Sequence, residues 1–208
     1  MKINVISSGS NGNAVIYDNR IMVDCGVSFA KIKPFVNDIA IVLLTHEHKD
    51  HVSIKTLSKI QSLRPTLRIG CCEWMLPLLS GLNNIDVYEI GTWYNYGSFR
   101  VAPIKLYHDV LNCGYRITID GYKILHATDT AHLEGITAKS YDLYAIEANY
   151  DEDKAMQAIA EAEERGEYCH AIGSIKSHLS KQQAFDFIER NRKETSEVLL
   201  LHKSNKFY

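Results

Sequence analysis

The pattern of hydrophobic and polar positions predicts strands and helices that alternate along the whole chain. Short apolar runs rich in β-branched residues are typical of buried strands, whereas apolar residues three or four positions apart indicate a helix that faces a core. Strands are expected at residues 2–6, 14–17, 21–25, 39–44, 67–71, 87–90, 99–106, 114–119, 122–127, 143–148 and 197–201. Helices are expected at residues 27–36, 54–63, 73–79 and 151–164, and a further helix begins at Ser180.

Turn signals connect several of these elements. Residues 18–20 and the pair Asp120-Gly121 lie between strand-like runs and predict two hairpins. Ser180, followed three residues later by Gln183, predicts a capping box at the start of the last helix. Each half of the chain thus combines paired strands with helices, which indicates an α/β protein.

Composition limits the domain count and the class of protein. The chain has 208 residues, 46% of them hydrophobic and 23% charged, which suits one globular domain over residues 1–208. No apolar run approaches a membrane span and no signal peptide is visible. The five cysteines show no zinc or disulfide spacing, so reduced thiols in the cytoplasm are expected.

The net charge of −2 gives no overall basic signature, but charge is unevenly distributed. Residues 142–167 contain nine acids and two bases, and residues 176–208 contain seven bases and four acids. Solvated helix faces explain both runs. The alternative is that the basic carboxy-terminal segment attracts a polyanion.

Three histidines and one aspartate lie together at residues 46–51, directly after the apolar run 39–44. Residues two apart on a helix point away from each other, so the cluster suits a loop at the carboxyl end of a strand. Imidazole and carboxylate ligands suit zinc, manganese or iron, and no cysteine lies near enough to suggest a structural thiolate site. The cluster His46, His48, Asp50 and His51 therefore predicts a catalytic metal site.

The order His-x-His-x-Asp-His resembles the metallo-β-lactamase-fold hydrolase superfamily. That family has three more ligands, each after a strand, and His108, Asp129 and His202 follow apolar runs in the required order. The resemblance implies a four-layer αββα sandwich and two divalent metal ions per chain, zinc or manganese. It also implies the ligand sets: one ion with His46, His48 and His108, the other with Asp50, His51 and His202, and Asp129 bridging them.

Three further segments resemble the single-domain YycJ/WalJ-like and tRNase Z-like phosphodiesterase branch. They are the Ser-His-Leu-Ser box at 177–180, the final ligand box at 199–205 and the Glu-Ala-Asn sequence at 147–149; the turn at 8–13 resembles the YycJ-like group in particular. The chain departs from tRNase Z and from the β-CASP nucleases, because it has no room for the arm of the first or the inserted domain of the second. What remains is a compact phosphodiesterase.

The resemblance implies hydrolysis of phosphodiester bonds in nucleic acid ends or short nucleotides by a metal-bound hydroxide. Two other enzymes stay open, a cyclic-nucleotide phosphodiesterase and a thioester or lactone hydrolase, beside a non-catalytic binding module. The expected partner is a nucleic acid, DNA or RNA, or a nucleotide. A homodimer also stays open, and no membrane partner is expected.

Catalytic, supporting and substrate-binding roles are predicted for further residues near the metal ligands. His178 is the expected proton donor to the leaving oxygen, with Glu147 holding it in its charged form and Asp50 as a third catalytic residue. Asp24 is expected to support a ligand histidine. Structural alternatives stay open, since His178 could only cap a helix, Glu147 could be a solvated strand end and Asp24 could form a turn. The expected substrate-binding residues are Ser10, Asn11, Asn13, His178 and Ser180.

Overall fold

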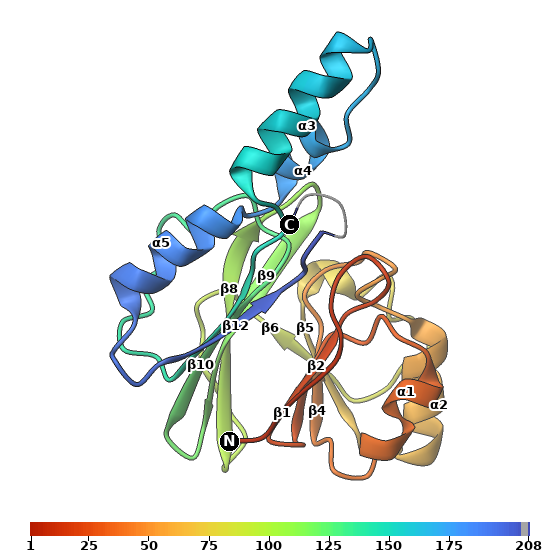
Figure 1. The fold of residues 1–208 in the computed structure, drawn as a ribbon. Coiled ribbons are helices and arrows are strands. Elements are labelled where there is room, and N and C mark those ends of the chain that lie inside the picture. Colours follow the sequence, from red (N-terminus) through yellow and green to blue (C-terminus); the bar gives the residue numbers. More distant parts are fainter. Residues whose placement is uncertain (205–207) are drawn as a thin grey trace. The chain divides into compact units, whose positions relative to one another are not determined.

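The computed structural model describes residues 1–204 and 208. Contacts between residues divide the chain into two compact units, Met1–Ile90 and Gly91–Tyr208. Each unit is built on one six-stranded sheet (Figure 1). The single domain expected over residues 1–208 stays a prediction, and the two units are described separately.

The sheet of the first unit follows the order of the sequence, β1-β2-β3-β4-β5-β6. The strands β1 to β3 pair antiparallel, and β3 to β6 pair parallel. Asp18 and Asn19 have φ values of 50° and 57°, which fits a type I′ turn and confirms the predicted hairpin between β2 and β3. The bounds are β1 Ile3–Ser7, β2 Ala14–Tyr17, β3 Ile21–Val23, β4 Ile41–Leu43, β5 Arg68–Cys72 and β6 Ile85–Tyr88.

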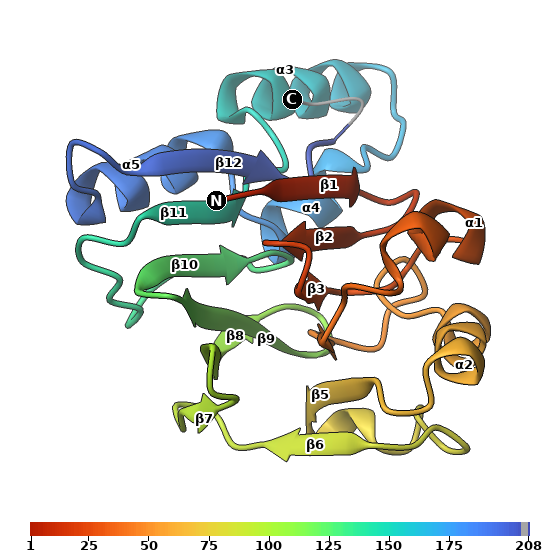
Figure 2. The ribbon, with the colours of Figure 1, turned by 90° about the horizontal axis from the view of Figure 1, so that it is seen from below.

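The helices of the first unit, α1 (Phe29–Ile32) and α2 (Ile54–Leu63), lie on one side of this sheet (Figure 2). Their apolar side chains join one buried cluster with residues of β2 to β5. A short 3-10 helix, η1 (Lys33–Phe35), continues α1.

The helix predicted over residues 73–79 is wrong, because only the 3-10 turn η2 (Glu73–Met75) forms there. Leu76 N–H donates to the Glu73 carbonyl at 3.0 Å, as in a 3-10 turn. Pro77 has no N–H to donate to the same carbonyl, so an α-helix cannot continue.

The sheet of the second unit has the order β12-β11-β10-β9-β8-β7. The strands β7 to β10 pair antiparallel, and β10, β11 and β12 pair parallel. Asp120 and Gly121 have φ values of 48° and 87° in the predicted hairpin between β9 and β10. The bounds are β7 Tyr94–Asn95, β8 Phe99–Tyr107, β9 Leu111–Ile119, β10 Tyr122–Ala127, β11 Leu143–Glu147 and β12 Glu197–Leu201.

Three helices belong to the second unit: α3 (Glu152–Glu164), α4 (Ala171–Ser177) and α5 (Lys181–Asn191). Phe187 and Ile188 of α5 share a buried cluster with the sheet residues Leu125 and Tyr144. The capping box at Ser180 is present, as predicted. The helix α4 was not predicted, because it is short and contains Gly173, which weakens a helical pattern; it packs beside α3 through small side chains (Figure 1).

The sheet topology explains where the predicted ligands lie. In the second unit β8, β10, β11 and β12 run in the same direction, so the residues that follow them come to one edge of the sheet. In the first unit β3 and β4 are parallel neighbours and likewise end at one edge. Among the described residues, no helix combines the length and apolar character that a membrane crossing requires.

Candidate metal centre

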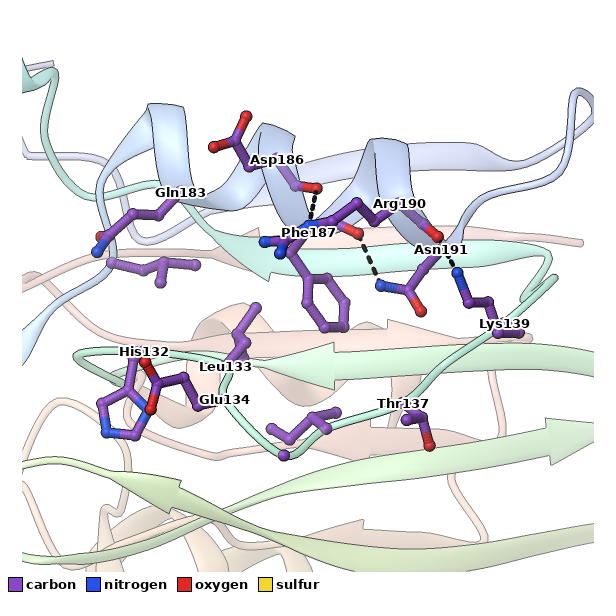
Figure 3. Close-up of a pocket in the computed structure, with 13 residues that line it drawn as sticks. His132, Leu133, Glu134, Thr137, Lys139, Gln183, Asp186, Phe187, Arg190 and Asn191 are labelled. Atoms are coloured by element: carbon purple, nitrogen blue, oxygen red, sulfur yellow. Dashed lines mark hydrogen bonds between the residues drawn. The ribbon is translucent and has the colours of Figure 1, made fainter.

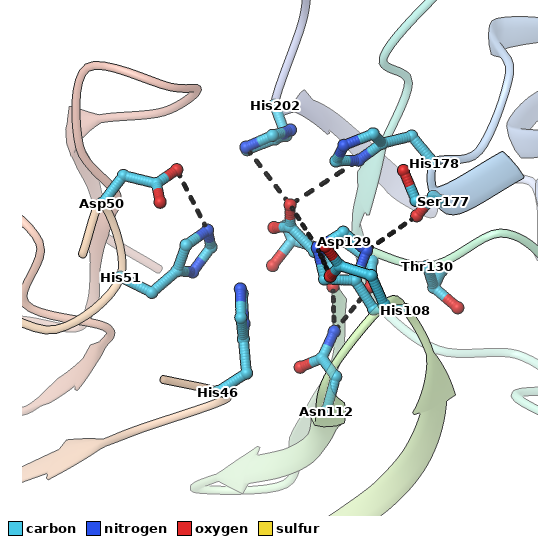
Figure 4. A network of polar contacts seen from close by, with 12 residues as sticks. His46, Asp50, His51, His108, Asn112, Asp129, Thr130, Ser177, His178 and His202 are labelled. Carbon is cyan, nitrogen blue, oxygen red and sulfur yellow. Dashed lines mark hydrogen bonds and ion pairs between the residues drawn. The ribbon is translucent and has the colours of Figure 1, made fainter. Parts of the chain in front are cut away.

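The loop after β4 brings four predicted ligands together within the first unit. His46 and His51 are buried, and their ring centroids lie 4.1 Å apart. The centroid of His48 lies 4.7 Å from that of His46. His51 Nε2 lies 3.7 Å from Asp50 Oδ2 (Figure 4). The loop of residues 46–51 therefore brings three imidazoles and one carboxylate together.

Asp24, directly after β3, is a buried carboxylate that orients this loop. Its Oδ2 accepts a hydrogen bond from His51 Nδ1 at 2.7 Å, and its Oδ1 accepts one from the Thr45 backbone N–H at 3.0 Å. The Thr45 hydroxyl lies 3.0 Å from Asp24 Oδ1 and 3.0 Å from His46 Nδ1. Because both Nδ1 atoms are engaged, Nε2 is the atom that each histidine could offer to a metal.

Asn13 joins the turn at residues 8–13 to the ligand loop. Its side-chain Nδ2 lies 2.8 Å from His51 Nε2 and 3.3 Å from Asp50 Oδ2. Its backbone N–H donates to the Asp50 carbonyl at 2.6 Å. Asn13, predicted to bind substrate, therefore contacts two predicted metal ligands.

Gly26 allows the ligand loop to approach the segment after β3. A Cβ atom at this position would lie 1.7 Å from the Asp50 carbonyl oxygen, which no side chain tolerates. The loop also pairs with its neighbour through the bridge between Cys25 and Val52. The absence of a side chain at Gly26 is thus a condition for the position of Asp50.

The second unit gathers its donors from separate elements. Asp129 follows β10, Glu147 ends β11, His178 follows α4 and His202 follows β12. One donor atom from each of the four lies within 4.8 Å of the others. Asp129 Oδ1 lies 3.3 Å from His202 Nε2 and 3.6 Å from His178 Nδ1 (Figure 4).

Glu147 is fully buried, which excludes the alternative of a solvated strand end. Its Oε1 lies 2.6 Å from His178 Nδ1 and 3.2 Å from His202 Nδ1. Its Oε2 accepts hydrogen bonds from the backbone N–H of Thr130 at 2.9 Å and of Leu179 at 3.3 Å. Because these four contacts occupy both oxygens, Glu147 positions two histidines and is poorly suited to ligate a metal itself.

The same contacts shift the pKa values of Glu147 and His178. Burial raises the pKa of the Glu147 carboxyl, but hydrogen bonds with His178 and His202 outweigh it, and the pKa is lowered. Burial lowers the pKa of His178, but the hydrogen bond and charge of Glu147 outweigh it, and the pKa is raised. The pair therefore favours a carboxylate beside an imidazolium.

His108 lies directly after β8 and joins the donors of the second unit. Its Nδ1 lies 2.9 Å from the Ser177 carbonyl, to which it donates. Its Nε2 lies 3.9 Å from Asp129 Oδ1 and 3.1 Å from Asp109 Oδ1. The backbone contact favours the tautomer in which Nε2 could bind a metal.

Three supporting polar residues were missed by the sequence analysis. Asn149 Nδ2 lies 3.2 Å from His202 Nδ1 and donates to its backbone carbonyl at 2.9 Å. Asn112 Nδ2 donates to the Asp129 carbonyl at 2.6 Å. Thr45 directly precedes the ligand cluster, and Asn149 belongs to the Glu-Ala-Asn sequence of the family resemblance, so both roles could have been found from the motifs. Asn112 has no such signal.

Three site residues have an uncommon backbone conformation. Asp24, Asp129 and His202 have φ values of 61°, 58° and 50°; Asp24 and His202 directly follow a strand, and Asp129 lies two residues after one. This left-handed region is sparsely populated for residues other than glycine, and the strain tends to occur at functional sites. The chain bends sharply at each of these strand ends.

The donors of both units fit a divalent metal ion. They are imidazole nitrogens and carboxylate oxygens, which suit zinc, manganese or iron. Asp24 and Glu147 supply the carboxylates that orient ligand histidines in such centres. These clusters can bind metal.

The remaining predicted substrate-binding residues lie in different surroundings. Ser10 and Asn11 are exposed on the turn of the first unit. Ser180 is buried; its hydroxyl accepts from Gln183 N–H at 3.0 Å and contacts Glu152 Oε1 at 2.5 Å. Asn205, at the end of the final ligand box, lies outside the described residues.

A separate cavity of about 440 Å³ lies beside α5 in the second unit (Figure 3). Leu133, Leu179 and Phe187 provide apolar walls, and Glu134 and Arg190 are among its charged lining residues. None of the predicted site residues lines it. The cavity is therefore distinct from the candidate metal centre.

Comparisons with known proteins identify relatives of this chain. The exodeoxyribonuclease WalJ of Streptococcus pneumoniae is 27% identical over 171 residues, which cover 72% of this chain and 63% of that protein. The chain thus spans less than two thirds of the length of this curated relative.

Solved structures share the fold at low sequence identity. The metallo-β-lactamase fold protein YhfI of Bacillus subtilis aligns with a TM-score of 0.65 and 16% identity, covering 99% of this chain and 96% of that one. Human tRNase Z, short form, aligns with a TM-score of 0.67 and 17% identity, covering 99% and 93%. The likeness to these structures confirms the prediction of an α/β protein with the αββα metallo-β-lactamase fold. The model of the beta-lactamase superfamily domain matches residues 19–202, and the chain belongs to this family.

Proposed function

We propose that this protein is a metal-dependent phosphodiesterase that hydrolyses nucleic acid ends or short nucleotides. The contact between His178 and the fully buried Glu147, 2.6 Å long, carries the proposal. Cleavage of a phosphodiester produces an alkoxide that needs a proton, and this pair holds one. The likeness to an exodeoxyribonuclease supports the same reaction.

We assign two divalent ions, zinc or manganese, to the seven ligands predicted from the family resemblance. The contacts within each unit support this assignment, which comprises His46, His48, Asp50, His51, His108, Asp129 and His202. When bound, such ions lower the pKa of an attacking water and neutralise charge on phosphoryl oxygens.

The residues of the chain itself handle the leaving group. Glu147 engages His178 through Nδ1, so Nε2 is the atom that delivers the proton. His202 contacts the same carboxylate oxygen, and its ring stacks on that of His178 at a centroid distance of 5.2 Å. Glu147 therefore aligns a metal ligand and the proton donor together.

The substrate and the cellular compartment are part of the proposal. Ser10, Asn11 and Asn13 belong to a turn that contacts the ligand loop through Asn13, where they can meet a phosphate. The five cysteines are free and buried, which is consistent with a cytoplasmic protein. We expect one polypeptide to suffice for hydrolysis, whether or not it forms a homodimer.

His178→Ala tests the role of the proton donor. The protein, loaded with manganese or zinc, is offered bis-p-nitrophenyl phosphate, a 3′,5′-cyclic nucleotide and a labelled oligonucleotide. The variant should lose roughly 10²-fold or more in kcat on the oligonucleotide, the usual contribution of a general acid. It should lose much less on bis-p-nitrophenyl phosphate, because p-nitrophenolate leaves without protonation.

His170→Ala, which removes an exposed histidine of the same region, is the matched control and should behave like the unmodified protein. Metal content, measured in parallel, should be the same in all three proteins. An equal loss on the oligonucleotide and on bis-p-nitrophenyl phosphate would contradict the role of His178. Hydrolysis of thioesters or lactones without any phosphodiester turnover would replace the proposed function.

A further inference from the structure

A groove of about 560 Å³ lies beside the ligand loop within the first unit. Three lysines line it: Lys49 lies inside the ligand loop, and Lys55 and Lys59 lie on α2. No lining residue is acidic, and the other polar or aromatic lining residues include Ser28, Ser53 and Phe29. The groove therefore carries one sign of charge.

No carboxylate among the described residues neutralises the positive charge of the groove; Lys59 Nζ lies over the Phe29 ring, 5.9 Å from its centroid. Among the residues that the structure describes, Lys49, Lys55 and Lys59 form no ion pair. Lys55 and Lys59 are four positions apart on one helix, and such like charges repel by a few tenths of a kcal/mol unless an anion lies between them. This arrangement is expected of a surface that binds a negatively charged ligand.

The basic carboxy-terminal segment is different. Three of its seven bases pair with acids of the same unit, so part of its charge is compensated. These pairs include Arg192 with Glu189 at 3.0 Å, Lys181 with Asp151 at 3.7 Å, and Lys193 with Asp142. These pairs favour a solvated helix face for the paired bases, whereas none of the three groove lysines has an ion pair among the described residues.

The walls of the groove are held by hydrogen bonds. The Ser53 backbone N–H donates to the Cys25 carbonyl at 2.9 Å, and the Thr56 hydroxyl donates to the Val27 carbonyl at 2.8 Å. These bonds fix the segment after β3 against the start of α2. The groove also includes the amino-terminal end of α2, where the helix dipole adds to the attraction for anions.

We propose that this groove binds the sugar-phosphate backbone of a nucleic acid strand whose end is cleaved at the metal centre. The inference rests on the proposed function and adds to it the surface that holds the strand. Lysines act as point charges for phosphates, and a groove of one sign concentrates anions. Lys49 lies between His48 and Asp50, so the groove is continuous with the ligand loop.

The double variant Lys55→Ala and Lys59→Ala tests the groove without altering a ligand. Binding of a labelled single-stranded oligonucleotide is measured at several salt concentrations, with a chelator present to prevent cleavage. Each lost phosphate contact makes the fall of log affinity with log salt shallower by about 0.7. The salt slope of the double variant should therefore be shallower by about 1.4 than that of the unmodified protein. Affinity near 0.15 M salt should fall roughly tenfold, and the difference should vanish near 1 M.

The matched control is Lys2→Ala with Lys33→Ala, which removes the same charge from exposed positions of the first unit outside the groove. It should keep the salt slope of the unmodified protein. The groove variant should also raise KM for the oligonucleotide and leave turnover of bis-p-nitrophenyl phosphate unchanged, because that substrate is too small to span the groove.

The outcomes separate this inference from the proposed function. An unchanged slope in the groove variant, or an equal decrease in the control, would overturn the groove as the strand-binding surface. Oligonucleotide binding without any phosphodiester turnover would overturn the proposed function and keep the groove. Turnover of bis-p-nitrophenyl phosphate without measurable oligonucleotide binding would keep the function and overturn the groove.

Discussion

The first unit takes its four predicted ligands from one short loop, whereas the second unit takes its donors from the ends of strands that are far apart in sequence. In the first unit, residues 46–51 fold into a turn in which the His51 N–H donates to the His48 carbonyl at 2.9 Å. In the second unit, Asp129, Glu147 and His202 meet because three neighbouring strands run parallel.

The two constructions depend on different interactions. The loop of the first unit depends on close packing against adjacent backbone, above all at Gly26. The donors of the second unit depend on strand alignment and on Glu147, which connects two histidines. A substitution beside the ligand loop of the first unit should disturb only that loop. A substitution at Glu147 should displace several donors of the second unit.

Gly26→Ala should have the largest effect on stability. The new methyl group would meet the Asp50 carbonyl oxygen at 1.7 Å, so the backbone of the ligand loop must move. Overpacking of this kind costs about 3 kcal/mol, which lowers the melting temperature of a protein of this size by roughly 10 °C. Thermal unfolding and metal content together measure the effect, and metal binding should fall as well.

Gly173→Ala is the control for this substitution. Its added methyl would meet only the Tyr168 hydroxyl, at 4.0 Å, and alanine is the better helix former in α4. The control should be as stable as the unmodified protein or slightly more so. Equal stability of the Gly26 variant would show that the ligand loop is not fixed by close packing.

Glu147→Gln and Asp24→Asn compare the supporting carboxylates of the two units directly. Each amide would present N–H groups where a histidine now donates, which disfavours the metal-binding tautomer. Each variant should lose about 10- to 100-fold in metal affinity, measured by titration with a competing chelator.

The two variants should differ once metal is saturating. The Asp24 carboxylate contacts Thr45 and His51 rather than His178, so Asp24→Asn should regain most of its activity. Glu147 also holds His178, so Glu147→Gln should stay impaired on the oligonucleotide. Full recovery of both variants would mean that Glu147 acts only through the metal ligand His202.

The contrast between the units also explains how much the sequence could predict. The ligand loop of the first unit is visible as a dense cluster after an apolar run, because its geometry is set locally. The donors His108, Asp129 and His202 were identified only through the family resemblance and their order, because strand pairing cannot be deduced from spacing.

Some features could not be read from the sequence at all. Asn112 supports Asp129 through a backbone carbonyl, and an asparagine in a strand gives no signal for that role. The helix α4 carries few buried residues, so its apolar periodicity is weak. The lysines of the groove are ordinary surface residues in the sequence, and the packing of α2 against the segment after β3 is what lines them up along one groove.

Asp142→Asn should have the smallest effect and tests whether strand alignment supports the second unit. Asp142 directly precedes β11; its Oδ2 accepts from the Lys123 backbone N–H of β10 at 2.8 Å, and its Oδ1 pairs with Lys193. Burial raises the pKa of Asp142, but these contacts outweigh it, and the pKa is lowered. The free energy of unfolding of the variant, measured with urea, should be about 1 kcal/mol lower at pH 7 than that of the unmodified protein.

The dependence on pH identifies the charge as the cause. The pKa of Asp142 is lower in the folded protein than in the unfolded chain, where it is about 4. Its charge therefore stabilises the fold fully above pH 4, and this stabilisation is lost as pH falls through the folded pKa. The difference between the variant and the unmodified protein should therefore shrink below pH 4. Asp38→Asn, at an exposed position of the first unit, should cause little loss at any pH. Asparagine removes the charge of Asp142 but keeps an acceptor oxygen for the Lys123 N–H. A difference that stays constant with pH would therefore contradict charge as the cause of the loss.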